Sequence, residues 1–370
     1  MGMETKLEFV IAYLSSIISI RVKDDLLKDI SMEKRRKQTF DGLKATFVGE
    51  SQNKPVVVIL EDMHWIDQTS EEFLLYLSSS VAKNRIMILA LHRPSYQCPW
   101  ARSSSYQQIS IGRLSRTESE EMLRNMLRVQ EVAAEVKDLV QRKAEGNPFF
   151  MEELILELLE SGLVRKEGKV CRLVDQAVNP PVPATVQDVI MARIDRLENI
   201  YKRTLQLASV IGREFIFTIL EKITEPGHKL GPVLQALQQS ELITEKNLFP
   251  ELIYMFKNAL TQDVAYNSLL LKQRKVLHTR VAAAIEEIKN NALEEHLETL
   301  AYHYKKGDRP EKAFEFLVRA GEKAMELSSV EVAKGYFIEA LKIAPGHPKS
   351  EPFRKREQAI RSQLQKLTAH

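Results

Sequence analysis

The chain has 370 residues, of which 44% are hydrophobic and 28% charged, so it has enough apolar material for two or three folded domains. Its 53 basic and 50 acidic residues give a formal net charge of +3, which is too balanced to predict binding to nucleic acid or to a membrane. Two cysteines exclude a disulfide framework, and no apolar run reaches the roughly 20 residues of a membrane-spanning helix, so we expect a cytoplasmic protein.

The first fifty residues predict helices. Residues 8–20 form an apolar amphipathic stretch that no small-residue cleavage site follows, which favours a helix over a signal peptide. Apolar side chains recur at helical spacing over residues 26–30 and again over residues 40–47, so we expect two further helices. The basic cluster at residues 34–37 could bind phosphate, but such clusters on helices are more often a solvated face.

A run of five aliphatic residues, Val56–Leu60, predicts a strand that is buried on both faces, as in a parallel sheet. Two acids, Glu61 and Asp62, follow it directly, and a third, Asp67, lies a few residues further on. At the carboxyl edge of a parallel sheet, carboxylates can hold a hydrated Mg²⁺ beside a phosphate. The pattern is that of a Walker B strand.

The following stretch, HWIDQTSEEFLLYL, continues into an amphipathic helix that Thr69 or Ser70 could cap. Together with the acidic end of the strand, it resembles the signal-transduction NTPases of the STAND class, which are AAA-like P-loop ATPases. The resemblance implies that Glu61 and Asp62 act as catalytic acids that handle Mg²⁺ and water.

A Walker A motif needs two glycines five positions apart, then Lys and Ser or Thr, because backbone N–H groups wrap the phosphates. None of the fourteen glycines has that arrangement. The one Gly-Lys pair, Gly168 and Lys169, precedes Val170 and predicts a loop. In STAND proteins the P-loop lies amino-terminal to the Walker B strand, so we expect only part of an NTPase domain here.

Residues 85–91 predict a second buried strand, which ends in His92 and Arg93. In the family this is the sensor strand. A guanidinium at its end can donate two parallel hydrogen bonds to phosphate oxygens. The resemblance thus implies nucleotide binding by Arg93, and it also implies nucleotide binding by Asp67. Without a nucleotide, the favoured alternative is that Arg93 pairs with an acid such as Asp62.

A short third strand is expected around Ile109–Ile111. In the family, the P-loop strand lies between the sensor strand and this strand, so its absence leaves two edges that face an empty slot. The two strands could pair directly, a partner chain could supply the missing strand, or the leading segment could cover the slot. We favour direct pairing or a marginal fold, and we predict poor solubility for the first 130 or so residues expressed alone.

The next segment predicts a helical lid. Thr117 and Glu120 suit a capping box, and two helices follow. The sequence at residues 146–149, GNPF, resembles the GxP motif of the family's lid. Gly146 suits a helix end and Pro148 a helix start, and this turn role suffices to explain both residues. The resemblance adds contact of Pro148 with adenine.

Three prolines within residues 180–183 mark a stiff connector. The helices from Thr185 onward and a two-stranded wing resemble the winged helix of the same family. A DNA-reading helix presents Arg, Lys, Asn or Gln to base edges. The third helix, residues 230–242, offers glutamines but also Glu241, with only Lys229 as a nearby cation, so we expect no nucleic-acid partner.

From Leu269 onward, amphipathic helices recur at intervals of about twenty residues, as in a helical solenoid. The last pair resembles the tetratricopeptide pattern, in which Gly321 permits close helix approach, Phe337 fills the gap and Pro345 ends the unit. Beyond Ala344 we expect a polar, frayed tail.

We therefore expect a mainly α protein with a small parallel α/β portion, built from a partial AAA-like NTPase domain, a winged helix and TPR-like helical repeats. The predicted segments are an NTPase core without Walker A at residues 1–130, a lid at 131–180, a winged helix at 181–268, repeats at 269–345 and a polar tail at 346–370.

The resemblance covers almost the whole chain and is to the region found carboxy-terminal to class III adenylate or guanylate cyclase domains and in MalT-like regulators. It implies a regulatory ATPase fragment without a cyclase domain, in which ATP and Mg²⁺ bind weakly and are not turned over. A non-catalytic scaffold that binds protein partners through the repeats is the alternative. DNA binding ranks third.

Overall fold

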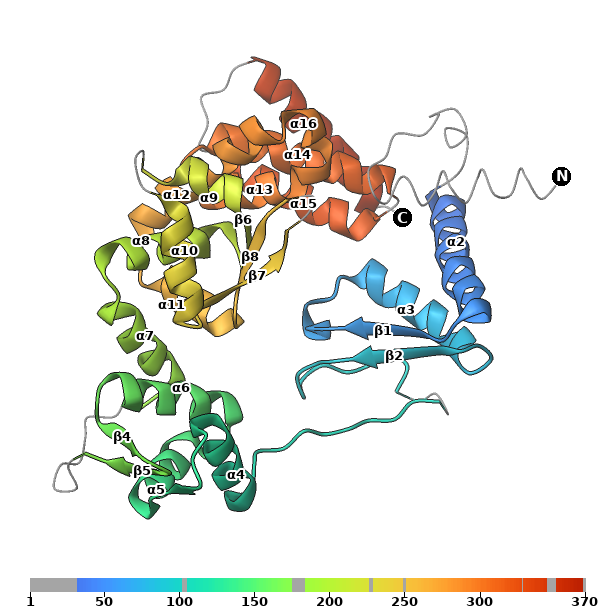
Figure 1. Cartoon of the computed structure of the whole chain (residues 1–370). Coiled ribbons are helices and arrows are strands. Elements are labelled where there is room, and N and C mark those ends of the chain that lie inside the picture. Colours follow the sequence, from blue (N-terminus) through green and yellow to red (C-terminus); the bar gives the residue numbers. More distant parts are fainter. Residues whose placement is uncertain are drawn as a thin grey trace. The chain divides into compact units, whose positions relative to one another are not determined.

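The computed structural model describes residues 32–101, 105–174, 184–225, 229–248, 251–327, 329–344 and 351–368. These residues are mainly helical, and their strands form small sheets of two or three strands (Figure 1). The chain divides into two compact units. The first unit holds residues 1–109, 289–305 and 309–370, and the second unit holds residues 110–288 and 306–308. The expected mainly α fold with a small parallel portion is confirmed, whereas the five predicted segment boundaries stay a prediction.

The first unit begins with helices and two parallel strands. They are α2 (Met32–Asn53), β1 (Val56–Leu60), the 3-10 helix η2 (Met63–Trp65), α3 (Gln68–Val81) and β2 (Ile86–Ala90). β1 and β2 pair in parallel from Val56↔Ile86 to Leu60↔Ala90, where the two apolar runs predicted strands. Of the two helices expected before β1, the second is α2, and the first lies outside the described residues, as does the stretch at 8–20.

One face of this sheet is covered and the other is bare. On the covered face, Ile86 is 6% exposed, and α2 and α3 pack against the strands. On the bare sheet face, Val57, Ile59, Met87 and Leu89 are 53%, 61%, 52% and 39% exposed. Side chains of a strand alternate between its faces, so covering one face leaves every second residue in solvent. The expectation that the first strand is buried on both faces is wrong.

The expected third strand near Ile109–Ile111 does not form. Residues 106–115 have no regular secondary structure, and Ile109 and Ile111 are 77% and 92% exposed. Among the described strands, β2 pairs only with β1, so its outer edge is open. Direct closure of the sheet, which we favoured, is therefore wrong, because two β-branched residues make no strand without a neighbour to pair with.

The second unit begins with helices and a small sheet. Its first elements are α4 (Arg116–Leu127), β3 (Glu131–Val132), α5 (Ala134–Ala144), α6 (Pro148–Glu160), β4 (Val164–Glu167) and β5 (Val170–Leu173). The capping box of α4 joins Ser115 and Glu118 and not Thr117 and Glu120, which corrects the expected cap. The strands lie in the order β3-β5-β4, and the β4–β5 hairpin turns at Gly168, where we expected only a loop.

The rest of the second unit is a winged helix, followed by one long helix that packs against two of its helices. Its elements are α7 (Val186–Arg196), α8 (Asn199–Ile211), β6 (Glu214–Ile216), α9 (Phe217–Ile223), α10 (Leu230–Gln239), β7 (Ile243–Asn247), β8 (Ile253–Phe256), α11 (Ala259–Asn267) and α12 (Leu271–Ile288). The wing is the antiparallel pair β7–β8, and β6 adds a third strand to it. The proline connector at 180–183 lies outside the described residues.

Stacked helices complete the first unit. They are the 3-10 helix η3 (Asn290–His296), α13 (Leu297–Lys306), α14 (Pro310–Glu326), α15 (Val330–Ile343) and α16 (Glu351–Thr368). A Cβ at Gly321 would lie 2.5 Å from the Phe337 ring, so α14 and α15 pack as the tetratricopeptide pattern predicts. Where we expected a frayed tail, α16 packs on α15 and buries Ile360.

Candidate functional site

The two parallel strands of the first unit end side by side, so the residues that follow them leave the sheet at the same edge. The Leu91 amide donates to the Leu60 carbonyl at 2.8 Å, and the Met63 amide donates to the Leu91 carbonyl at 3.0 Å. Glu61 and Asp62 therefore leave the sheet at the same edge as Arg93. The structure places these three predicted site residues on adjacent loops.

Glu61 and Asp62 are both exposed at this edge. Asp62 has left-handed backbone angles, φ 55° and ψ 37°, and its carbonyl accepts a hydrogen bond from the Trp65 amide at 2.8 Å. Such angles are uncommon outside glycine, and Asp is among the residues that tolerate them. The turn directs the chain from β1 into η2 and keeps both carboxylates outside the apolar layer.

Whether a magnesium ion fits at this edge depends on the side chains that could coordinate it. Within the described residues, no group of three or more His, Cys, Asp or Glu side chains is arranged to hold a metal ion. Mg²⁺ commonly uses one or two carboxylates and completes its shell with water and substrate phosphate oxygens. Glu61 and Asp62 therefore fit a magnesium ion that arrives with a phosphate, but not one held by protein ligands alone.

Asp67 serves as the N-cap of α3. Its carboxylate accepts hydrogen bonds from the Ser70 amide at 3.0 Å and from the Ser70 hydroxyl at 2.5 Å. The expected cap by Thr69 or Ser70 is therefore wrong, because the acid before them takes the position. The cap gives Asp67 a structural role, and nucleotide binding by Asp67 stays a prediction.

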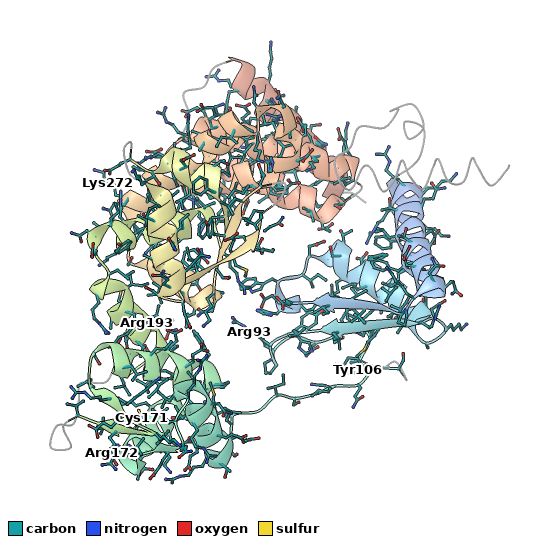
Figure 2. All side chains as sticks on the ribbon, in the orientation of Figure 1. Arg93, Tyr106, Cys171, Arg172, Arg193 and Lys272 are labelled. Carbon is teal, nitrogen blue, oxygen red and sulfur yellow. The ribbon has the colours of Figure 1, made fainter. Side chains whose placement is uncertain are left out.

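Arg93 is exposed, and its guanidinium makes no hydrogen bond or ion pair with any described residue. The alternative in which it pairs with Asp62 is therefore wrong for this structure. Its carbonyl lies 2.9 Å from the Nδ1 atom of His92, whose ring packs near Tyr96. The guanidinium is available to an anion at the sheet edge (Figure 2).

The three predicted acids, Glu61, Asp62 and Asp67, all line one cavity of about 970 Å³ within the first unit. Arg35 and Arg36 of the basic cluster also line it, whereas Lys34 and Lys37 are exposed. Arg36 forms an ion pair with Glu72, and Arg35 donates to the carbonyl of Glu326 at 2.6 Å. The basic cluster is thus only partly the solvated face that we expected.

Pro148 belongs to the second unit and is the first residue of α6. Asn147 caps this helix by accepting from the Phe150 amide at 3.1 Å. Gly146 has φ +76°, and a Cβ there would lie 2.3 Å from the Leu114 carbonyl oxygen. The turn role that we expected for these residues explains them, and contact of Pro148 with adenine stays a prediction.

A buried ion pair joins α6 to α7, and no sequence pattern predicted it. The Nη1 atom of Arg193 lies 2.5 Å from the Oε2 atom of Glu153, and Arg193 also donates to the Ser240 carbonyl at 3.0 Å. Arg193 is labelled in Figure 2. Burial raises the pKa of Glu153, although Arg193 acts in the opposite direction. A second pair, Arg196 with Glu157, lies on the same two helices.

Among the described residues, the helix and the wing that would contact DNA do not form a basic surface. The helix that would read DNA, α10, has no charged residue between Leu230 and Gln239. In the wing, Lys246 pairs with Glu214, and Lys257 pairs with Glu241 at 2.6 Å. These pairs neutralise cations that phosphate contacts would need.

Three comparisons place this structure among known proteins. Residues 115–172 match the family described as a domain of unknown function, DUF8739. An uncharacterized protein of Rhizobium meliloti (strain 1021) is 25% identical over 291 residues, which are 78% of this chain and 28% of that protein. The crystal structure of a Signal Transduction ATPase with Numerous Domains (STAND) protein with a tetratricopeptide repeat sensor, from Pyrococcus horikoshii, matches with a TM-score of 0.51 and 15% identity. That match covers 98% of this chain and 53% of the archaeal chain.

The structural match shows that the chain has the fold of that STAND protein, which confirms the expected fold class. The chain spans about a quarter of the length of the bacterial relative and about half of the archaeal one. None of the described helices combines the length and the apolar character that crossing a membrane requires.

Proposed function

We propose that this chain is a regulatory module of the STAND class that binds an adenine nucleotide weakly and does not hydrolyse it by itself. The observation that supports it most is the shared end of β1 and β2, where Glu61, Asp62 and Arg93 lie on adjacent loops. Two carboxylates can hold Mg²⁺ beside a phosphate, and an arginine without a protein partner can bind the phosphate oxygens.

Weak binding without turnover follows from what these 370 residues do not contain. No glycine-rich loop with a Lys and a Ser or Thr is present to wrap the phosphates. Hydrogen bonds to charged groups contribute about 1.5 to 3 kcal/mol each, so the loss of several removes most of the affinity. The resemblance to regions that follow class III cyclase domains suggests a cytoplasmic signalling context, with protein partners at the repeats or at the open edge of β2.

Calorimetric titration with Mg-ATP tests the proposal. We expect weak binding to the unchanged chain, and we expect the double variant Glu61→Gln with Asp62→Asn to remove it. Glu50→Gln is the matched control, since Glu50 is an exposed acid of the same unit that does not line the cavity. Robust phosphate release by the purified chain, lost in the double variant, would contradict the proposal.

A second candidate function is a non-catalytic scaffold that holds a protein partner on its helical repeats. Two large side chains of these helices, Tyr302 and Ile338, are 49% and 46% exposed. Mg-ATP titration separates the two functions, because the scaffold requires no heat of binding in either the unchanged chain or the double variant. DNA binding remains the third candidate, since the wing cations are paired with acids.

A further inference from the structure

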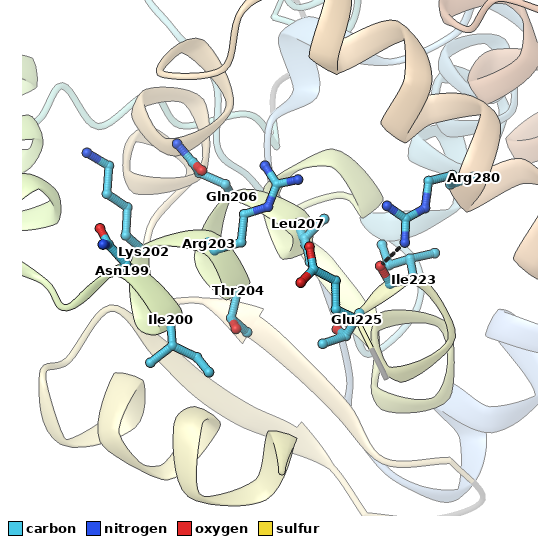
Figure 3. Close-up of a pocket in the computed structure, with 11 residues that line it drawn as sticks. Asn199, Ile200, Lys202, Arg203, Thr204, Gln206, Leu207, Ile223, Glu225 and Arg280 are labelled. Carbon is cyan, nitrogen blue, oxygen red and sulfur yellow. Dashed lines mark hydrogen bonds between the residues drawn. The ribbon is translucent and has the colours of Figure 1, made fainter. Parts of the chain in front are cut away.

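A cavity in the second unit has no role in the proposed function. It has a volume of about 550 Å³ and lies between the first turns of α8, the end of α9 and one residue of α12 (Figure 3). Cavities of about 300 to 1,000 Å³ are typical of small-molecule sites. All of its lining residues belong to the second unit, whereas Glu61 and Asp62 belong to the first.

The charges in this cavity favour an anion. Three cations, Lys202, Arg203 and Arg280, line it against one acid, Glu225. Lys202 is held by Asp195 at 2.6 Å, but Arg203 has no hydrogen bond or ion pair with any described residue. A half-buried guanidinium without a protein partner keeps its full set of donors for a ligand.

Two contacts hold the end of α9, which forms one wall of the cavity, against α12. Arg280 donates to the carbonyl of Ile223, the last residue of α9, at 2.6 Å, which the dashed line in Figure 3 marks. Lys222 of α9 pairs with Glu287 of α12 at 2.7 Å. A wall held at two points reduces the ordering cost of binding.

The hydroxyl group of a mostly buried threonine is also available. Thr204 is 4% exposed and lines the cavity, yet its hydroxyl makes no hydrogen bond with any described residue. Its oxygen is not among the fully enclosed side-chain atoms that lack a partner, so it keeps some accessible surface and can bond to a ligand in the cavity. The adjacent turns of α8 also place the amino-terminal end of a 13-residue helix at the cavity, which favours negative charge.

Apolar side chains form the rest of the lining. Ile200, Leu207 and Ile223 contribute to it, and Leu207 and Ile223 are 4% and 2% exposed. A bare inorganic anion would leave this apolar surface uncovered. We propose that the cavity binds a small phosphate-bearing metabolite with an apolar body, with the phosphate on Arg203 and the hydroxyl of Thr204.

Phenyl phosphate and inorganic phosphate are suitable probes for calorimetric titration of the full chain at fixed ionic strength. Phenyl phosphate carries the same anionic group with an apolar ring, so we expect it to bind more tightly than inorganic phosphate. We expect Arg203→Ala to weaken its binding at least about tenfold, because charge-assisted bonds are lost. Arg172→Ala is the matched control, since Arg172 is exposed in the same unit and lies outside the cavity.

Thr204→Val provides a second test. It keeps the shape of the side chain and removes a hydroxyl without a protein partner, so we expect weaker binding of phenyl phosphate and an unchanged melting temperature. Failure of phenyl phosphate to bind, equal binding by the Arg203→Ala variant, or a lower melting temperature with unchanged binding in Thr204→Val would each overturn the proposal. Glu61→Gln with Asp62→Asn leaves this binding unchanged if the two sites are independent.

Discussion

The guanidinium of Arg193 and the carboxylate of Glu153 lie 2.5 Å apart, and their side chains are only 4% and 6% exposed. Removal of one partner from such a pair leaves a buried charge without compensation. We expect Arg193→Met alone to lower the free energy of unfolding by about 3 to 5 kcal/mol. Glu153→Leu combined with Arg193→Met restores most of this loss, because an apolar pair needs no ionic partner.

Urea unfolding followed by circular dichroism measures this effect. Tryptophan fluorescence does not, because Trp65 and Trp100 both lie in the first unit. The exposed pair of Lys222 and Glu287 provides the control, and Lys222→Ala should change stability by less than about 1 kcal/mol. Equal effects of the buried and the exposed single substitutions would contradict the expected role of burial.

His278 makes stability depend on pH. Burial lowers its pKa from the ordinary 6.5 to about 4, assisted by Lys306 and Arg274, and its Nε2 atom lies 2.9 Å from the Tyr266 hydroxyl. Below pH 6.5 the unfolded chain takes up a proton that the folded chain refuses, so stability falls as the pH drops from 6.5 towards 4. The full difference is about 3 kcal/mol.

Comparison with His278→Gln isolates this effect, because Gln does not titrate and can still bond to Tyr266. We expect the unchanged chain to lose more stability than the variant between pH 7 and pH 4 in chemical denaturation series. Parallel losses in both proteins would show that His278 is not responsible.

Gly146 is required for two separate reasons, and two variants distinguish them. Gly146 has φ +76° and a Cβ there would meet the Leu114 carbonyl oxygen, whereas Gly168 has φ +61° and open space around it. We expect Gly168→Ala to cost about 1 kcal/mol from backbone strain alone. Gly146→Ala should cost at least about 3 kcal/mol because a steric clash is added. Thermal unfolding of both variants measures the difference, and equal losses would refute the clash.

The bare sheet face predicts that polar substitutions improve solution behaviour without loss of stability. Val57→Thr and Met87→Gln replace exposed apolar side chains, so we expect less aggregation in light scattering and a stability change within about 0.5 kcal/mol. Ile86→Thr is the control on the covered face, where loss of a buried side chain should cost about 2 kcal/mol. If all three variants behave alike, the two faces do not differ as described.

The sequence predicted those elements whose signal is local. The runs at Val56–Leu60 and Ile86–Ala90 are apolar, β-branched and bounded by polar residues, and both form strands. Gly146 and Pro148 carry their own backbone preferences, and they mark the end of one helix and the start of the next. Gly321 similarly indicated close packing of α14 and α15.

Features that depend on residues distant in the chain could not be predicted in this way. Ile109 and Ile111 have the composition of a strand, but none of the described strands pairs with them. The pairing of Arg193 with Glu153 spans 40 positions and depends on how α6 meets α7. At the candidate site, the sequence indicated the acids at the strand end, but not that Arg93 has no acidic partner among the described residues.

The contact between Gly321 and Phe337 restricts how the repeat helices can respond to a bound partner. Because an aromatic ring occupies the space that a side chain at Gly321 would need, α14 and α15 approach each other closely at this point. We therefore expect a partner that binds one of these two helices to move both together, because closely packed side chains transmit displacement.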